Sequence, residues 1–368
     1  MVNHPFVPQS LIGRQTELQQ IAEIFLRDGD LLIAGVPGSG RRTLIRWAAQ
    51  QVKARVLEID CMRATDSQRF LQILAESLMA AFNSPQEQGI IQDWITQYPL
   101  NLEPGIHGRA RLVWHLATEG EWSLFQTLLS LPQVMAEALD CRVVIVFQNF
   151  PHLRSWDRSG NWEAYLRQEI QRQSRVSYAL IAMVAESWVQ DSSLQVISLS
   201  PLRNQDLFPW FVKVMETEGL RFDPEGKALG LFLSYVQGHV GDAIALARRI
   251  WLDCRVLSSL KDLGKEGIIQ SHHVHRSALA LVEDLAQTFE SLIFLLPPSQ
   301  VRVLESLALD PTDSPHSKEY IQKHHLSRGG SLQGALASLE QKGLVYGSQY
   351  SYRITLPLLA FWLRYRLT

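Results

Sequence analysis

The chain has 368 residues, of which 46% are hydrophobic and 20% charged, and its formal net charge is -2. This composition is typical of a folded globular protein and excludes a globally basic nucleic-acid-binding chain. Three scattered cysteines argue against a disulfide framework and favour a reducing compartment. Because no apolar run reaches the length of a membrane span and the N-terminus does not resemble a signal peptide, we expect a cytoplasmic protein without a membrane partner.

Short apolar runs of strand length alternate with helical periodicities over the first 203 residues. This alternation predicts a parallel α/β sheet of about five strands. Residues 83–110 contain three prolines and are expected to be irregular. The predicted strands are 31–34, 54–60, 142–147, 177–184 and 194–202, and the predicted helices are 14–27, 41–52, 68–82, 123–140 and 165–173, with Pro132 as a candidate kink.

Strand-like runs stop at Asn204, and residues 204–296 read as helices throughout. The pair Pro297-Pro298 then marks a break. Beyond it we expect a winged-helix module, because three helical segments precede two short strands that flank a Gly-Ser-Gln turn. These segments are helices 299–309, 317–326 and 331–342 and the wing 344–354.

The stretch "GVPGSG" (35–40) lies between a predicted strand and a predicted helix, which is the context of a phosphate-binding loop. Glycines let backbone N–H groups curl around phosphate oxygens at a helix N-terminus. Arg41 and Arg42, however, occupy the positions of the usual lysine and metal-binding hydroxyl, and Thr43 comes one residue late. An arginine binds phosphate but does not ligate Mg²⁺. The alternative is a glycine turn of an unrelated α/β fold.

Gln148 and Asn149 follow the buried run "RVVIVF", where a phosphate-transferring enzyme would carry two acids. Amides keep hydrogen-bonding capacity but lack the charge that metal binding and water activation need. The alternative is that this strand only forms part of the core and the two amides are polar residues at its end, without a function. Asp60 and Glu186 follow two other predicted strands and are candidate displaced acids, since ligands gather at the carboxyl ends of parallel strands.

Several segments, in their order and spacing, resemble the motifs of STAND-type P-loop ATPases of the archaeal-ATPase branch of the AAA+-related group. The glycine loop resembles the family's Walker A motif, and the run ending in Gln148 and Asn149 resembles its Walker B motif. The other segments that carry the resemblance are "LIGRQTEL" (11–18), "ISLSPLRNQD" (197–206), "YVQGHVGDA" (235–243) and "SLQGALASLEQKGLV" (331–345).

The resemblance implies a parallel-sheet P-loop NTPase domain (1–203), an α-helical lid domain (204–296) and a C-terminal winged-helix domain (297–368). It implies no metal site, because the lysine, the hydroxyl and both acids are replaced together. Val240 likewise replaces the lid proline of the family. The nucleotide-binding residues that the resemblance implies are Gly13, Arg14, Gly35, Pro37, Gly38, Ser39, Gly40, Arg41, Arg42, Thr43, Gly238 and His239.

Three functions agree with these residues. The first is a scaffold or regulator that does not hydrolyse nucleotide, acts through protein contacts, and binds ATP or ADP without Mg²⁺ or is nucleotide-free. If nucleotide binds, Arg41 and Arg42 take the place of the lysine and the metal at its phosphates. If the protein is nucleotide-free, the two arginines point away from the loop or pair with carboxylates such as Asp60. The second is a slow ATPase completed by Asp60, by Glu186 or by a partner subunit. The third is a DNA-binding, initiator-like protein that uses the winged helix.

The segment 331–342 favours a protein partner over DNA, because it presents few of the long polar side chains that read bases. An oligomer remains an open alternative. His272, His273 and His275 stand close together, but no cysteine or acid stands nearby at ligand spacing. We therefore expect a solvated helix end there and no metal site.

Overall fold

The computed structural model describes residues 6, 11–105, 110–114, 120–170, 172–186, 188–189, 192–259 and 267–367. The chain divides into two compact units. The sheet unit consists of Gln15–Ala34 and Arg41–Ser198, and the helical unit consists of Met1–Arg14, Gly35–Gly40 and Leu199–Thr368. The chain therefore passes through the helical unit for six residues at the glycine loop before it returns to the sheet unit.

A five-stranded parallel sheet forms the centre of the sheet unit, in the order β2-β5-β6-β1-β7. The predicted fold class is confirmed. The central strands β5 and β6 are apolar and almost wholly buried, as expected for strands that helices cover on both faces. The strands are β1 (Leu31–Ala34), β2 (Arg55–Asp60), β5 (Val143–Gln148), β6 (Val176–Ala182) and β7 (Gln195–Ser198).

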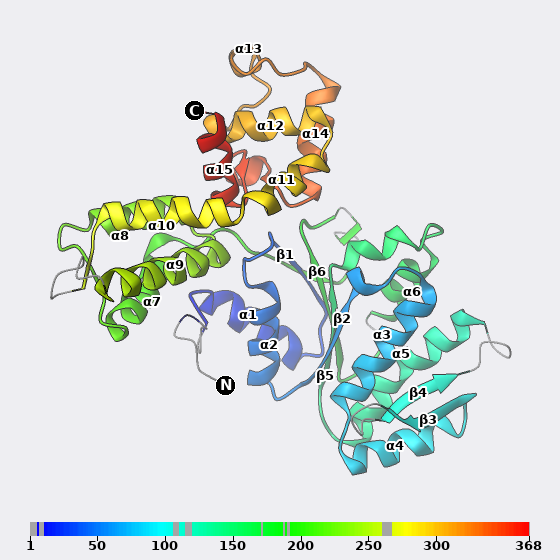
Figure 1. Ribbon diagram of the computed structural model, residues 1–368. Coiled ribbons are helices and arrows are strands. Elements are labelled where there is room, and N and C mark those ends of the chain that lie inside the picture. The colour runs from blue at the N-terminus through cyan, green and yellow to red at the C-terminus, as the bar shows by residue number, and fades with distance from the viewer. Residues whose placement is uncertain are drawn as a thin grey trace. The chain divides into compact units, whose positions relative to one another are not determined.

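Helices cover both faces of this sheet (Figure 1). On one face lie α1 (Gln15–Leu26) and α2 (Arg41–Gln51). On the other lie α3 (Ser67–Ala81), α5 (Glu121–Ala138) and α6 (Asn161–Glu169), which enclose the larger core. Two short 3-10 helices, Cys61–Arg63 and Phe150–Ser155, follow β2 and β5. Helix α5 runs through Pro132 without a break, so the proline does not split it.

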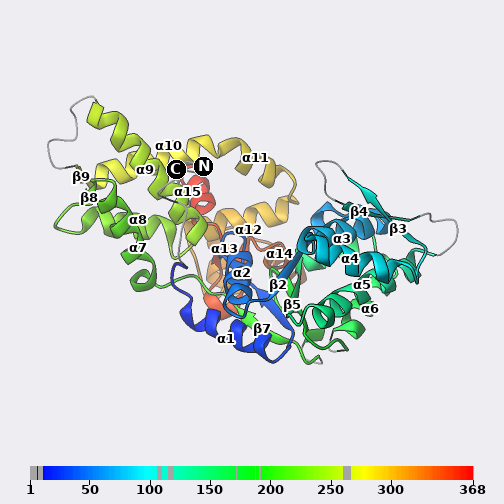
Figure 2. The same cartoon turned by 90° about the horizontal axis from the view of Figure 1, so that it is seen from below.

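The expectation that residues 83–110 are irregular is wrong. This region contains α4 (Pro85–Ile95), and β3 (Leu100–Pro104) pairs with β4 (Ala110–Trp114) beside α3 and α4 (Figure 2). Pro85 is the first residue of α4 and starts the helix, because a proline needs no hydrogen bond to its nitrogen there. Ser84 and Glu87 complete a reciprocal capping box.

The helical unit contains α7 (Asn204–Thr217), α8 (Lys227–Val236), α9 (Val240–Ser259) and α10 (Ser271–Asp284), which share one apolar core. The prediction of helices in this region is confirmed with one exception. Two two-residue strands, β8 (Arg221–Phe222) and β9 (Ile268–Ile269), pair in parallel. Their pairing joins segments 47 positions apart, which no local pattern indicates.

The last part of the helical unit is a winged helix, as predicted. Its wing is the antiparallel pair β10 (Val345–Tyr346) and β11 (Arg353–Ile354). The predictions missed α15 (Pro357–Leu367). Its apolar residues are distributed around the whole helix, so the sequence shows no clear helical period. The other helices are α11 (Ala286–Phe294), α12 (Pro298–Leu309), α13 (Lys318–Lys323) and α14 (Gly330–Gln341). Among the described residues, no helix combines the length and the apolar character that a membrane span requires.

Gly238 provides a test of this packing, because it has a φ of 79° and a Cβ there would lie 2.2 Å from the carbonyl oxygen of Leu202. We expect Gly238→Ala to lower the free energy of unfolding by at least about 2 kcal/mol, since both the left-handed backbone and the clash oppose a side chain. The matched control is Gly230→Ala in α8, where a Cβ meets open space. That change should raise stability by up to about 1 kcal/mol. Chemical denaturation measures both, and equal effects would contradict the prediction.

Candidate functional site

The glycine loop, Gly35–Gly40, has the backbone that only glycine adopts easily. Gly38 and Gly40 have φ values of +81° and +90°. Inside the loop the N–H of Ser39 donates to the carbonyl oxygen of Val36 at 3.2 Å. The Ser39 side chain is 7% exposed, and its hydroxyl has no hydrogen-bond partner among the described residues. Buried polar groups without a partner are rare, so this hydroxyl is a candidate for contact with a bound ligand.

His239 holds the loop from the start of α9. Its Nε2 lies 2.7 Å from the carbonyl oxygen of Pro37. Because a carbonyl oxygen only accepts, Nε2 carries the proton and donates. Its Nδ1 accepts from the N–H of Asp242 at 3.0 Å. Burial lowers the pKa of His239, but the hydrogen bond and charge of Asp242 and the Pro37 carbonyl outweigh burial and raise it overall.

Gly13 and Arg14 also lie in the helical unit. Arg14 is buried, and its guanidinium donates to the carbonyl oxygen of Ser200. A Cβ on Gly13 would lie 3.1 Å from the side chain of Leu202. The N–H of Leu202 in turn donates to the carbonyl oxygen of Gly238 at 3.0 Å. The segment after β7 therefore links the residues around Gly13 to those around Gly238.

Arg41, at the position of the usual P-loop lysine, begins α2 in the sheet unit. Its Nη1 donates to the carbonyl oxygen of Ala182 at 2.7 Å, at the end of β6. Burial lowers the pKa of this guanidinium to about 10. The side chain is thus directed at the strand end. The contact between Arg41 and a phosphate stays a prediction.

Arg42 and Arg46 both pair with Glu58, which lies on β2. Arg42 Nε is 3.1 Å from both carboxylate oxygens, and Arg46 Nε is 2.5 Å from Oε1. Burial raises the pKa of Glu58, but the two arginines outweigh it and lower the pKa overall. Arg42 therefore pairs with Glu58, which it shares with Arg46, rather than with Asp60. Thr43 is exposed.

The amides at the Walker B positions meet Asp60. Gln148 and Asp60 are register partners on the adjacent strands β5 and β2. Asn149, with a φ of +53°, donates from Nδ2 to Asp60 Oδ1 at 3.1 Å. Asp60 Oδ1 also accepts from the N–H of Met62. The structure thus brings Asp60, Gln148 and Asn149 together at one end of the sheet. The group contains one carboxylate and two neutral amides.

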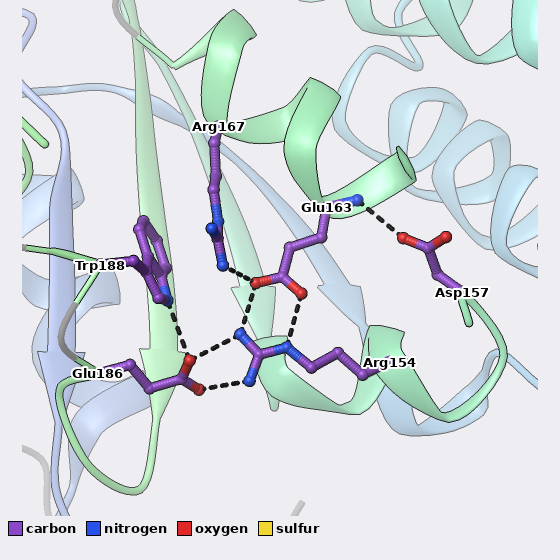
Figure 3. A network of polar contacts seen from close by, with 6 residues as sticks. All are labelled: Arg154, Asp157, Glu163, Arg167, Glu186 and Trp188. Carbon is purple, nitrogen blue, oxygen red and sulfur yellow. Dashed lines mark hydrogen bonds and ion pairs between the residues drawn. The ribbon is translucent and has the colours of Figure 1, made fainter. Parts of the chain in front are cut away.

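Glu186, the second candidate displaced acid, belongs to an ion-pair network that Figure 3 shows. Its carboxylate accepts from Arg154 Nη1 at 2.9 Å and from Arg154 Nη2 at 2.7 Å, and it accepts from Trp188 Nε1 at 3.0 Å. Arg154 also forms two hydrogen bonds with Glu163, at 2.7 and 2.6 Å. Arg167 contacts Glu163 as well and lies over the ring of Trp188.

Sequence reasoning missed Glu58, Arg154 and Glu163. A signal existed for Glu58, since it alternates with buried Leu57 and Ile59 and so lies on the same face of β2 as Asp60. Nothing in the local sequence indicates the network of Arg154, because its partners come from α6 and from the segment after β6.

We expected a solvated helix end at the histidine cluster, and the structure agrees only in part. His273 is 8% exposed, and its Nδ1 accepts from the N–H of Gln270. His275 Nδ1 lies 2.6 Å from the hydroxyl of Tyr235. Among the residues that the structure describes, no group of three or more His, Cys, Asp or Glu side chains is arranged to hold a metal ion.

Two family models match parts of the chain. The model described as "AAA ATPase domain" matches residues 10–181, and the one described as "Probable winged helix domain" matches residues 287–365. No curated protein sequence matches the chain. The two matches agree with the sheet unit and with the winged helix at the end of the helical unit.

Solved structures resemble the chain over nearly its whole length. A Walker-type ATPase of Pyrococcus abyssi has a TM-score of 0.67 at 15% identity, over 98% of this chain and all of that one. The ORC1 protein of Aeropyrum pernix, solved in complex with DNA, has a TM-score of 0.50 at 14% identity, over 99% and 97% of the two chains. The ORC2 protein of the same organism, in its ADP form, has a TM-score of 0.51 at 14% identity, over 100% and 97%. At these identities the likeness concerns the fold, which is that of an AAA+-like P-loop ATPase with a winged helix.

The network around Glu163 gives a stability prediction. Burial raises the pKa of Glu163, but Arg154 and Arg167 hold it below its ordinary value of 4.5. We expect Arg154→Met to lower the free energy of unfolding at pH 7 by about 2 kcal/mol, because Glu163 loses a partner while Arg167 remains and Arg154 is partly exposed. Arg158→Met, at an exposed arginine, is the matched control and should change the free energy of unfolding by less than about 0.5 kcal/mol.

The pH dependence of this effect has a definite sign. A carboxylate whose folded pKa is depressed stabilises the fold above its unfolded pKa and loses that contribution as pH falls through the folded pKa. The difference between wild type and Arg154→Met should therefore be full near neutral pH and shrink below pH 4.5. Denaturation midpoints at several pH values measure it. A difference that stays constant into acid would show that lost packing, rather than lost charge pairing, is responsible.

Proposed function

We propose that this AAA+-like P-loop ATPase fold with its winged helix belongs to a regulator or scaffold that does not hydrolyse nucleotide and acts through protein contacts. The observation that carries the proposal is the state of the acids near the strand ends. Glu58 pairs with Arg42 and Arg46, Asp60 accepts from Asn149, and Glu186 pairs with Arg154. Each is already held by a neighbour within the sheet unit.

Hydrolysis of a phosphoanhydride needs a carboxylate to hold the metal and another group to orient the attacking water. Gln148 and Asn149 cannot supply that charge at the usual positions. To act instead, Glu186 would have to leave an arginine that it contacts through two nitrogens. This arrangement argues against the alternative of a slow ATPase completed by displaced acids of this chain.

We propose further that the loop binds the phosphates of ATP or ADP without Mg²⁺, through backbone N–H groups rather than through arginine side chains. The positive φ values of Gly38 and Gly40 and the unpartnered hydroxyl of Ser39 support this binding mode. Arg41 and Arg42 would then contribute less, since Arg41 donates to Ala182 and Arg42 pairs with Glu58.

The winged helix supports a protein partner more than DNA. Helix α14 carries only one charged side chain, Glu340, whereas helices that read the major groove present several basic or amide side chains. Phe294 and Leu295, at the end of α11, are 88% and 79% exposed and line an open groove of about 680 Å³. Exposed apolar side chains of this size mark contact surfaces for proteins.

The first test is turnover and binding of nucleotide by the purified chain. We expect no Mg²⁺-dependent ATP hydrolysis above background, and binding of a fluorescent ATP analogue that persists in excess chelator and weakens as salt rises. A coupled phosphate-release assay and a fluorescence titration measure these. Hydrolysis that disappears on Arg41→Ala would overturn the proposal.

Two matched loop variants test the binding mode. Gly40→Ala strains a backbone with φ of +90° without a clash, since a Cβ there meets nothing within 4 Å. We expect it to weaken nucleotide binding at least tenfold, because the backbone N–H groups move out of position. Arg42→Gln should weaken it less than threefold. The reverse order of effects would show that the arginines neutralise the phosphates.

DNA binding is the remaining alternative, and a gel-shift titration decides it. We expect no retardation of duplex DNA at moderate salt. Retardation with an affinity that falls steeply as salt rises would instead favour an initiator-like function.

A further inference from the structure

A continuous series of hydrogen bonds runs through the helical unit from the glycine loop to the winged helix. It begins at the Pro37 carbonyl, which accepts from His239 Nε2 at 2.7 Å. It continues through His239 Nδ1, which accepts from the N–H of Asp242 at 3.0 Å. It ends where Asp242 Oδ2 accepts from the N–H of Leu358 at 2.9 Å.

The first link fixes the loop closely. His239 is 6% exposed, so its ring is enclosed and not free to rotate into solvent. A Cβ on Gly38 would lie 2.6 Å from His239 Cε1, and therefore only a glycine lets the loop approach the ring this far. A second bond, from the N–H of Gly241 to the carbonyl oxygen of Gly38 at 3.2 Å, ties the next loop residue to the start of α9.

The last link fixes the beginning of α15. Pro357 is the first residue of this helix and has no N–H, so Leu358 provides the first free donor of the helix. The carboxylate of Asp242 accepts that donor and also places a negative charge at the positive end of the helix dipole. Asp242 thus caps a helix of the winged-helix module through Leu358, which lies 116 positions further along the chain.

Asp242 takes part in both links at once. Its Oδ1 lies 3.0 Å from His239 Nδ1, while its other carboxylate oxygen holds Leu358. The side chain is 15% exposed, so it has little room to satisfy one partner after leaving the other. A displacement of His239 must therefore move Asp242 or weaken its bond to α15.

We infer that His239 and Asp242 are positioning residues that couple the conformation of the glycine loop to the first turn of α15 in the winged helix. Any ligand that reshapes the loop would act on α15 through these two side chains. The coupling to nucleotide rests on the proposed binding of ATP or ADP at the loop. The coupling between loop and α15 does not, and the two are tested separately.

The test is hydrogen–deuterium exchange of the full chain, read by mass spectrometry in peptides that cover the loop (35–40) and the first turn of α15 (356–363). Without nucleotide, Asp242→Ala should speed exchange about fivefold in both peptides, the effect of losing one hydrogen bond. Asp242→Asn should return both to within twofold of wild type, because its amide oxygen can accept from Leu358 and the backbone N–H of residue 242 still donates to His239 Nδ1.

His239→Ala is the decisive variant, since it removes the loop contact and leaves Asp242 and Leu358 in place. We expect faster exchange, by about two- to fivefold, in the first turn of α15 as well as in the loop. Exchange in α12 (Pro298–Leu309) is the internal reference and should stay unchanged. His316→Ala, at an exposed histidine of the winged helix, is the matched control and should leave both peptides unchanged. Faster exchange in the loop alone would overturn the coupling.

A second arm adds millimolar ATP and excess chelator. In the wild type, ATP should slow exchange in the loop and change it in the first turn of α15, and in His239→Ala it should act on the loop alone. If ATP acts on the wild-type loop but not on α15, the coupling is wrong. If ATP changes neither peptide, the proposed nucleotide binding fails, and the variants without nucleotide still decide the coupling.

Discussion

The hydrogen bond from His239 to the carbonyl oxygen of Pro37 constrains the rest of the helical unit. It requires a glycine at position 38, because any side chain there would overlap the histidine ring. It also requires the tight turn at Gly238, whose Cβ would meet the backbone of Leu202, since that turn delivers His239 to the loop. Gly38 therefore has a structural reason to be a glycine, beside any role of the loop in binding phosphate.

The sheet unit obeys a different constraint, which is charge compensation near the strand ends. Each acid there has at least one donor: Glu58 faces two arginines, and Glu163 shares Arg154 with Glu186 and contacts Arg167 as well. Burying a carboxylate is costly unless hydrogen-bond donors surround it, and here they do. In the proposed function, the same pairing that stabilises these acids also keeps them from binding a metal ion.

The two constraints underlie the proposed function, in which the loop binds nucleotide and the acids near the strand ends do not support hydrolysis. The likeness to a Walker-type ATPase and to ORC proteins concerns the fold alone. If the protein acts as the proposed regulator, it needs a way to transmit the state of the loop. Asp242 would provide a physical route, because its backbone N–H donates to His239 while its carboxylate accepts from Leu358.

The sequence by itself determined the five-stranded parallel sheet, the helical region after it and the wing, because apolar periodicity and glycine turns are local signals. It also showed that two amides, Gln148 and Asn149, stand where the resemblance places the Walker B acids. It did not determine α4, since Pro85 reads as a breaker until its capping box is seen, nor α15, which lacks a helical period. The partners of Arg42, Glu186 and His239 were decided only by the tertiary structure, because each pair joins elements distant in the chain. Strand register and helix packing, which no local pattern encodes, bring such side chains within hydrogen-bonding distance.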